Sequence, residues 1–216
     1  MKLTDCAIAV LISGNGSNLQ ALIDASGSSN FKMGLVISNN PTAFGLERAT
    51  RAGIETKIID HHDYASREEF DQALIAALDA FNPQLIVLAG FMRILSAGFV
   101  QHFSGRILNI HPSLLPKYTG TNTHQRAIDA GDSVHGVSVH FVTEELDGGP
   151  VIAQEKVSVL KNDTAAELAA RVSQKEHIIY PRVVSWFAGG RLHMKDNNAY
   201  LDDSLLPPCG LEIKPA

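Results

Sequence analysis

The stretch "PQLIVLAG" at residues 83–90 decides the fold. An unbroken apolar run from Leu85 to Ala89 lies between Pro83 and Gly90. A short strand that is apolar on both faces is typical of a parallel sheet covered by helices on both sides. This segment therefore predicts the central strand of an α/β fold.

Working outward from this strand, strand-like and helix-like segments alternate. Apolar strands are predicted at residues 6–13, 33–38, 55–60 and 106–110. Helices are predicted at residues 17–25, about 44–53, 67–81 and about 95–103. Ser66 and Glu69 form a capping box before the third helix. The alternation predicts a Rossmann-like, doubly wound, mostly parallel sheet.

The C-terminal part has a different pattern. "GVSVHFVTEELDGGPVIAQEKVSV" at residues 136–159 contains two strands joined by an acidic, glycine-rich loop, which predicts antiparallel pairing. A long helix follows, capped by Thr164 with Glu167 three residues later. No internal repeat or linker interrupts the chain. We therefore expect a single domain over residues 1–216, with an N-terminal half of about 1–105 and a C-terminal half of about 106–216.

Composition narrows the class of protein. Apolar residues make up 45% of the 216 residues, charged residues 19%, and the net charge is -5. Because there is no basic field, nucleic acid and anionic membranes are not expected as partners.

The cysteines and the N-terminal stretch indicate the compartment. Cys6 and Cys209 favour reduced thiols in a cytoplasmic protein. Asp5 interrupts the apolar N-terminal stretch, which we interpret as a strand and not a signal peptide, and no run approaches the ~18 apolar residues of a membrane span.

The first candidate site is "LISGNGSNLQ" at residues 11–20. Gly14 and Gly16 follow a strand and open a helix, where free backbone N–H groups favour an anion. Leu19 occupies the third glycine position of a dinucleotide fingerprint, and no acidic residue follows at the required distance. A single phosphate group therefore fits better than a pyrophosphate. The alternative is a tight turn in which Ser17 only caps the helix.

The second candidate is the pair Asn109 and His111 in "RILNIHPSLLPKY", residues 106–118. Residues two apart on a strand point to the same side, so both side chains reach one face at the strand's carboxyl end. Pro112 keeps His111 extended. An amide and an imidazole together can hold an oxygen that becomes negative. The alternative is that both only satisfy loop backbone groups.

Two carboxylates complete the candidates. Asp147 lies in an Asp-Gly-Gly turn signal, so it either shapes a turn or pairs with a histidine and keeps it charged. Glu176 falls on the apolar stripe of the long helix, between Val172 and Ile179, and needs a partner there. A ligand hydroxyl and a structural arginine are equally suitable.

The other histidines near these motifs show no metal-ligand spacing, so no metal is expected. They are His124, His135 and His140.

Four segments together carry a family resemblance. "LISGNGSNLQ", "AGFMRIL", "LNIHPSLLPKY" and "VHFVTEELDGGPVI" resemble the phosphoribosylglycinamide formyltransferase family over about residues 7–208. The Asn-x-His-Pro-Ser-Leu-Leu-Pro motif and the downstream Asp are shared by a wider group of 10-formyltetrahydrofolate enzymes. These include methionyl-tRNA formyltransferase and formyltetrahydrofolate hydrolase. The Gly-Asn-Gly-Ser-Asn loop is what points to a ribonucleotide substrate.

The resemblance implies the formyltransferase fold and a one-carbon transferase activity. The formyl group of 10-formyltetrahydrofolate, a co-substrate, would pass to the amine of 5-phosphoribosylglycinamide (glycinamide ribonucleotide). The products would be formylglycinamide ribonucleotide and tetrahydrofolate, in de novo purine (IMP) biosynthesis. Implied partners are these small molecules, and a homodimer is compatible with the sequence. Another 10-formyltetrahydrofolate enzyme, a hydrolase, and a non-catalytic nucleotide-binding module are the alternatives.

The resemblance also implies residue roles. Asn109 and His111 would stabilise the oxyanion, while Asp147 would keep His111 protonated and order a proton-relay water. The phosphate and ribose would be bound by Gly16, Ser17, Asn18, Ser173, Gln174, Lys175 and Glu176. The folate would be bound by Arg67, Met92, Arg93, Ile94, Leu95, Asn109, Thr143, Glu144, Glu145, Leu146 and Asp147. The N-terminal half would thus bind phosphate, and the C-terminal half would hold the catalytic and folate residues.

The sequence departs from the family pattern in the loop after the catalytic motif. Thr119 stands where proline is common and Thr121 where leucine is common. Loss of a proline removes a backbone restraint. We therefore expect this loop to be less rigid, with an effect on folate contacts but not on the trio.

Overall fold

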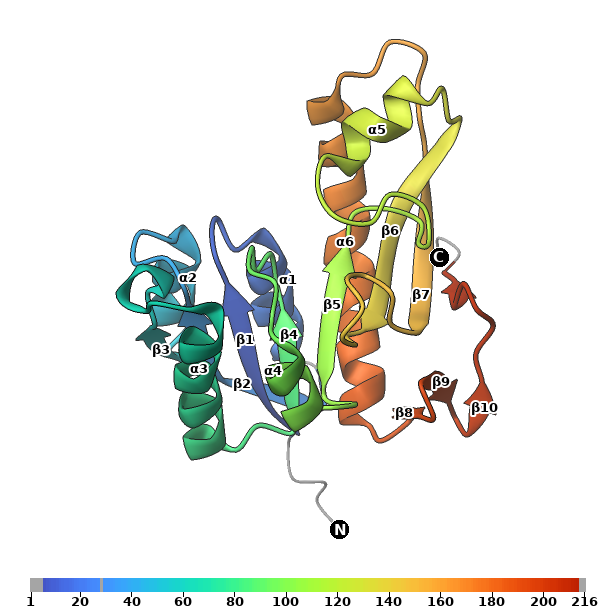
Figure 1. The fold of residues 1–216 in the computed structure, drawn as a ribbon. Helices are drawn as coiled ribbons and strands as arrows, with labels where there is room; N and C mark the ends of the chain where they lie inside the picture. Colours follow the sequence, from blue (N-terminus) through green and yellow to red (C-terminus); the bar gives the residue numbers. More distant parts are fainter. Residues whose placement is uncertain (1–5, 28, 214–216) are drawn as a thin grey trace.

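The computed structural model describes residues 6–27 and 29–213. An eight-stranded sheet in the order β11-β7-β6-β5-β4-β1-β2-β3 forms its centre (Figure 1). The strands are β1 (Cys6–Ile12), β2 (Phe31–Ser38), β3 (Glu55–Ile58), β4 (Leu85–Leu88), β5 (Ile107–His111), β6 (Val134–Phe141), β7 (Val151–Ser158) and β11 (Leu211–Glu212). The five strands from β3 to β5 across the sheet are parallel. β6 is antiparallel to both β5 and β7, and β11 is parallel to β7. The predicted mixed sheet is confirmed.

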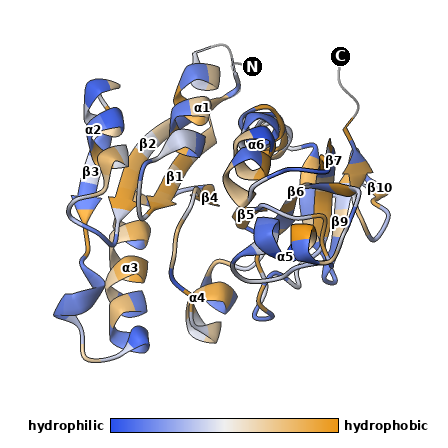
Figure 2. Cartoon of the chain, turned by 90° about the horizontal axis from the view of Figure 1, so that it is seen from above, coloured by the Kyte–Doolittle hydropathy of each residue, from blue (hydrophilic) through white to orange (hydrophobic). Residues whose placement is uncertain are grey.

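Helices cover both faces of the sheet. They are α1 (Ser17–Ser26), α2 (Phe44–Arg51), α3 (Arg67–Phe81), α4 (Ala97–His102), α5 (Thr123–Asp129) and α6 (Ala165–Ala188), with a short 3-10 helix η1 (His61–Asp63). One buried cluster joins α1, α2 and α6 to the sheet, and a second joins α3 and α4 to its other face. Figure 2 shows the hydrophobic strands β1 and β2 between these helical layers. The prediction of a sheet covered on both faces is therefore confirmed.

Burial on the two faces explains where β5 points its polar side chains. Leu108 and Ile110 belong to the cluster on the α6 side. By alternation, Asn109 and His111 face the opposite side of the sheet. The buried Tyr180 of α6 fixes the helix, because its hydroxyl donates to the backbone oxygens of Leu88 (2.9 Å) and Leu108 (3.0 Å) on neighbouring strands.

The predicted caps are present, with one difference in detail. Thr164 and Glu167 form a complete capping box at α6. Ser66 accepts from the backbone N–H of Glu69 at α3, but the Glu69 carboxylate reaches Ala65 N (3.2 Å) and not Ser66 N. The bond from Glu69 N to the Ser66 side chain is therefore as predicted. The Glu69 carboxylate accepts from the N–H one residue before Ser66, so the capping box is not complete.

Other differences lie in short elements. β4 is shorter than the predicted 83–90, and α5 and η1 were not predicted from the apolar periodicity. A separate small sheet near the C-terminus has the order β10-β9-β8. Its strands are β8 (Leu192–Lys195), β9 (Asn198–Leu201) and β10 (Ser204–Leu205). Within residues 6–27 and 29–213, no helix combines the length and apolar character that crossing a bilayer requires.

Candidate active site

Five parallel strands end at one edge of the sheet, and the candidate residues follow these ends. The glycine loop comes after β1, Met92 to Leu95 come after β4, and Asn109 and His111 lie at the carboxyl end of β5. Ligands of open α/β sheets bind at this edge, because helix N-termini and loop side chains meet there. Segments far apart in sequence are therefore brought to one place (Figure 1).

The glycine loop ends in a helix N-terminus without a side-chain cap. Gly16 is the N-cap residue with φ 75°, and Ser17 is the first residue of α1. The alternative in which Ser17 caps the helix is wrong. The first backbone N–H groups of α1 have no acceptor within the helix. They remain available to an anion, in agreement with the predicted phosphate loop.

Glycine is required at two positions that touch each other. A Cβ on Gly16 would lie 2.7 Å from the Cα of Gly45 on α2. The N–H of Gly45 in turn donates to the Gly14 carbonyl (3.1 Å). φ at Gly16 is also in the left-handed region, which disfavours any residue with a Cβ. Two independent causes, the contact with Gly45 and the backbone conformation, therefore exclude a side chain at Gly16. The loop therefore rests directly on the backbone of α2.

Arg48 of α2 holds the same loop from outside. Its Nε donates to the Asn15 carbonyl (2.9 Å) and its Nη2 to Asn15 Oδ1 (3.1 Å). A third bond runs from Nη1 to Gln20 Oε1 on α1 (3.2 Å). The guanidinium thus joins the loop, α1 and α2. No sequence motif indicates Arg48, because its contacts depend on how α2 packs.

Glu176 has a partner that was not foreseen. Asn18 Nδ2 donates to its Oε2 at 2.9 Å, so the carboxylate of α6 reaches the glycine loop. The structural arginine weighed above is therefore replaced by an asparagine. Burial raises the pKa of the Glu176 carboxyl, against the lowering effect of the Asn18 hydrogen bond. Asn18 Oδ1 is buried and has no hydrogen-bond partner among the described residues.

The three residues before Glu176 have different surroundings. Ser173 Oγ contacts His177 Nε2 at 3.3 Å, and Gln174 is exposed. Lys175 Nζ lies 2.6 Å from Oε1 of the buried Glu155 on β7. Only Glu176 of the predicted group 173–176 is thus hydrogen-bonded to the glycine loop.

The Asn109 side chain is oriented by His140. The two residues face each other across β5 and β6, and Asn109 Nδ2 lies 3.1 Å from His140 Nε2. His140 Nδ1 donates to the Phe141 carbonyl (2.8 Å), which leaves Nε2 as the acceptor. Burial lowers the pKa of His140 to about 4, so the ring is neutral near neutral pH. A single sequence offered no sign of this pairing beyond the presence of a histidine.

His111 is buried and both of its ring nitrogens face protein atoms. Nε2 lies 2.8 Å from the Tyr118 carbonyl, to which it donates. Nδ1 lies 3.4 Å from Asp147 Oδ2. A protonated ring can donate toward both acceptors. The structure therefore brings His111 and Asp147 together, but it directs His111 Nε2 to the loop and not toward Asn109.

The loop between β6 and β7 folds back to place Asp147. Asp147 has φ 52°, and its side chain is only 8% exposed. Asp147 Oδ2 accepts from Gly120 N (2.8 Å), while Oδ1 lies 3.8 Å from His140 Nε2. Because His140 is neutral, this second contact is not an ion pair near neutral pH. A Cβ on Gly149 would lie 1.9 Å from the Phe141 oxygen, so the turn requires glycine there.

The loop with the unusual threonines is held mainly through its backbone. Arg126 Nη1 donates to the carbonyls of Thr119 (2.6 Å) and Thr121 (3.3 Å). These bonds do not depend on the side chains at either position. The expected loss of rigidity stays a prediction.

The residues predicted to bind folate lie mostly at the surface. Met92 (74%), Ile94 (58%) and Leu146 (52%) are among the most exposed large apolar side chains described. Leu95 packs into the cluster formed with α3 and α4. The remaining side chains of the loop after β6 are half-buried at Thr143 and exposed at Glu144 and Glu145.

Two arginines of the predicted folate site differ in their surroundings. Arg67 is exposed and contacts Glu68 Oε1 (3.3 Å). Arg93 Nε is buried without a hydrogen-bond partner among the described residues. An unpaired buried donor costs free energy unless a ligand meets it. Arg93 is thus the more suitable of the two for an anionic ligand.

His124 and His135 form a pair of their own. His135 Nε2 lies 3.2 Å from His124 Nδ1. Burial lowers the pKa of both rings, that of His135 to about 4. No third ligand group joins this pair among the described residues.

Comparisons with known proteins agree with these features. A family model described as formyl transferase matches residues 6–184. The chain is 57% identical over 205 residues to the phosphoribosylglycinamide formyltransferase of Escherichia coli (strain K12), covering 94% of this chain and 97% of that protein. It is 48% identical over 192 residues to the Homo sapiens trifunctional purine biosynthetic protein adenosine-3, covering 88% of this chain and 19% of that longer protein. A solved phosphoribosylglycinamide formyltransferase from Coxiella burnetii superposes with a TM-score of 0.93 at 52% identity, covering 97% of this chain and 99% of that one.

Proposed function

The chain belongs to the formyl transferase family, and from this membership we propose that it is a phosphoribosylglycinamide formyltransferase. It transfers a formyl group from a folate-derived donor, 10-formyltetrahydrofolate, to the amine of 5-phosphoribosylglycinamide. The observation that carries the proposal is the meeting of an anion loop with Asn109, His111 and Asp147 at one sheet edge. The first feature selects a phosphorylated acceptor, and the second suits acyl transfer.

The acceptor is held at two points. Its single phosphate lies against the N–H groups of Gly16, Ser17 and Asn18, where the helix dipole favours negative charge. Its ribose hydroxyls donate to Glu176, whose carboxylate already reaches this loop through Asn18. Ser173, Gln174 and Lys175 stay candidates for further contacts. In this arrangement the amine of the acceptor extends from the loop toward β5.

The donor occupies the surface formed by the loops after β4 and β6. The exposed Met92, Ile94 and Leu146 provide apolar area for the folate ring system. Sites for small molecules are lined mostly by apolar side chains. Arg93, with Arg67 further out, meets the carboxylates of its tail. The apolar and basic groups thus match the two ends of one ligand.

The chemical step forms one C–N bond and breaks another. The acceptor amine attacks the formyl carbon, and the bond from that carbon to folate N10 breaks as a proton passes from the amine to N10. Asn109 has a second amide hydrogen beyond the one given to His140, and it donates to the developing oxyanion. Protonated His111 donates from Nε2 once that nitrogen exchanges the Tyr118 carbonyl for the oxyanion. Asp147 keeps His111 charged and orders the water that carries the proton.

A folate absorbance assay tests the proposal. Purified protein, 10-formyl-folate and glycinamide ribonucleotide should give deformylated folate and formylglycinamide ribonucleotide in equal amounts. Formate release without the ribonucleotide would instead identify a hydrolase. Formyl transfer only to other amines would identify a different transferase, and ribonucleotide binding without turnover a binding module. The cytoplasmic location, a homodimer and the division near residue 105 stay predictions.

A further inference from the structure

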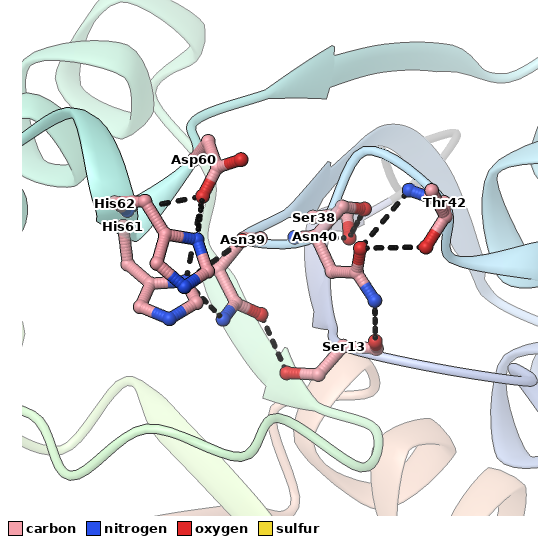
Figure 3. A network of polar contacts seen from close by, with 8 residues as sticks. All are labelled: Ser13, Ser38, Asn39, Asn40, Thr42, Asp60, His61 and His62. Atoms are coloured by element: carbon pink, nitrogen blue, oxygen red, sulfur yellow. Dashed lines mark hydrogen bonds and ion pairs between the residues drawn. The ribbon is translucent and has the colours of Figure 1, made fainter.

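A cluster of potential metal ligands lies outside the groups used above. Asp60, His61 and His62 follow β3, on η1 and its N-cap. Each offers one ligand atom, and the three atoms lie within 4.8 Å of one another. Figure 3 shows the two imidazoles close together beside the Asp60 carboxylate, with the ring planes tilted by 38°. Among the described residues this is the cluster in which three such groups meet.

The separations within the cluster suit a tetrahedral transition metal. Asp60 Oδ1 lies 2.8 Å from His62 Nδ1 and 3.6 Å from His61 Nδ1. Two ligands about 2.0 Å from a tetrahedral Zn²⁺ are about 3.3 Å apart, between these two values. Two imidazoles and one carboxylate are also the donor set that zinc takes when one position stays open to water.

Asn39 holds the His61 ring in its present orientation. Ser13 Oγ donates to Asn39 Oδ1 (2.6 Å), which turns the Asn39 amide nitrogen toward His61 Nδ1 (3.1 Å) (Figure 3). The Asn39 carbonyl lies 3.0 Å from the same ring nitrogen. These contacts hold the His61 ring beside Asp60 in the absence of a cation. Because they are made at Nδ1, a cation that binds this nitrogen displaces them.

The cluster opens onto a cavity that it shares with Met92 and Arg93 of the proposed folate surface. A cavity of about 470 Å³ is lined by Ser13, Asn39, Asn40, Pro41, Asp60, His61, His62, Met92 and Arg93. The His62 side chain is 75% exposed, whereas those of His61 and Asp60 are 21% and 23% exposed. A metal can therefore enter from solvent, beside two half-buried ligands that are already ordered.

We propose that Asp60, His61 and His62 form a binding site for one divalent transition metal ion of the Zn²⁺ class. None of these three ligands is assigned to formyl transfer, although Met92 and Arg93 of the proposed folate surface line the same cavity. Metal binding by the three ligands does not require the proposed function. It revises the expectation of a metal-free protein, which was drawn from other histidines. The Asp-His-His triplet at the end of the predicted strand 55–60 was the sequence signal available for it.

Zinc titration of the full, chelator-washed chain tests the site. Calorimetry with ZnCl₂ should show one saturable site per chain, weakened roughly ten-fold or more in His62→Ala and in Asp60→Asn. The amide oxygen introduced by Asp60→Asn can still accept from His62 N, so that second variant keeps the cap of η1. Co²⁺ should give the visible absorption of a tetrahedral centre in the wild-type chain and lose it in both variants.

The matched control is His102→Ala. His102 Nε2 and Asp79 form an exposed histidine–carboxylate pair at 2.9 Å, with no third ligand among the described residues. Its loss should leave Zn²⁺ affinity unchanged. Equal affinity in the wild-type chain and His62→Ala, or equal weakening by His102→Ala, would overturn the proposal. Matching circular dichroism spectra establish that each variant is folded.

Discussion

Asn18 and Glu176 lie 158 residues apart and are joined by a 2.9 Å hydrogen bond from Nδ2 to Oε2. The bond fixes the distance between the phosphate loop and the carboxylate proposed to hold the ribose. The protein itself therefore holds the loop and the Glu176 carboxylate together, without help from the acceptor. Preorganisation of this kind lowers the cost of ordering side chains on binding.

Replacing Glu176 tests the ribose contact. Glu176→Ala should raise the KM for glycinamide ribonucleotide roughly ten-fold or more with a smaller change in kcat, because a charge-assisted hydrogen bond is lost from ground and transition states alike. Glu176→Gln keeps an oxygen that can accept from Asn18 but loses the negative charge. Compared with Glu176→Ala, it should therefore regain more of the free energy of unfolding than of the affinity for the ribonucleotide. Glu47→Ala, which removes an exposed carboxylate from α2, is the control. An unchanged KM in Glu176→Ala would return Glu176 to a structural role.

Removing the charge of Asp147 should affect turnover more than binding. In Asp147→Asn the side-chain oxygen can still accept from Gly120 N, so the loop keeps its shape. His111 loses its anionic partner, and kcat should fall by about 10²-fold or more while KM values change little. Steady-state kinetics measures both. Near-normal kcat would exclude the proposed trio, and Asp129→Asn on the exposed face of α5 provides a carboxylate control.

Arg48 should act through the phosphate loop that it holds. Arg48→Ala removes three hydrogen bonds to Asn15 and Gln20 and should raise the KM for the ribonucleotide several-fold, with kcat little changed. Arg51→Ala removes the same charge one turn later, where the side chain pairs with Glu47. If both variants raised KM equally, long-range charge and not loop support would be the cause.

The buried His140 should make stability depend on pH. Burial lowers its pKa from 6.5 to about 4, so below pH 6.5 the unfolded chain binds a proton that the folded chain does not. Stability is therefore fully present above the unfolded pKa and falls as the pH drops toward the folded one. From about pH 7 to about pH 5 the loss is about 2 kcal/mol, at roughly 1.4 kcal/mol per pKa unit. The free energy of unfolding, measured with urea at both pH values, should fall by about 2 kcal/mol more in the wild-type chain than in His140→Asn. An equal fall in the two chains would contradict the assignment.

The periodicity of the sequence was sufficient for the main elements because burial follows it. The apolar segments at residues 6–13 and 33–38 became adjacent strands, and the capped stretch after Ser66 became α3. The spacing of Asn109 and His111 correctly placed both on one face of β5. These predictions depend on local geometry alone, which a single sequence contains.

Contacts between distant segments were not readable in this way. The pairing of His140 with Asn109, and the support of Asn15 by Arg48, depend on strand register and helix packing. The orientation of the His111 ring depends on the course of the loop to Tyr118. The family resemblance supplied the roles of site residues, but not these partners.

The contact between Gly16 and Gly45 has a consequence for how this site can change in evolution. Where two main chains touch with no side chains between them, no rotamer change can widen the space. A different position of the loop would therefore require α2 to move as a whole. We expect the shape of this loop to change in evolution through insertions or deletions in the connection between β2 and α2, and not through single substitutions at Gly16 or Gly45.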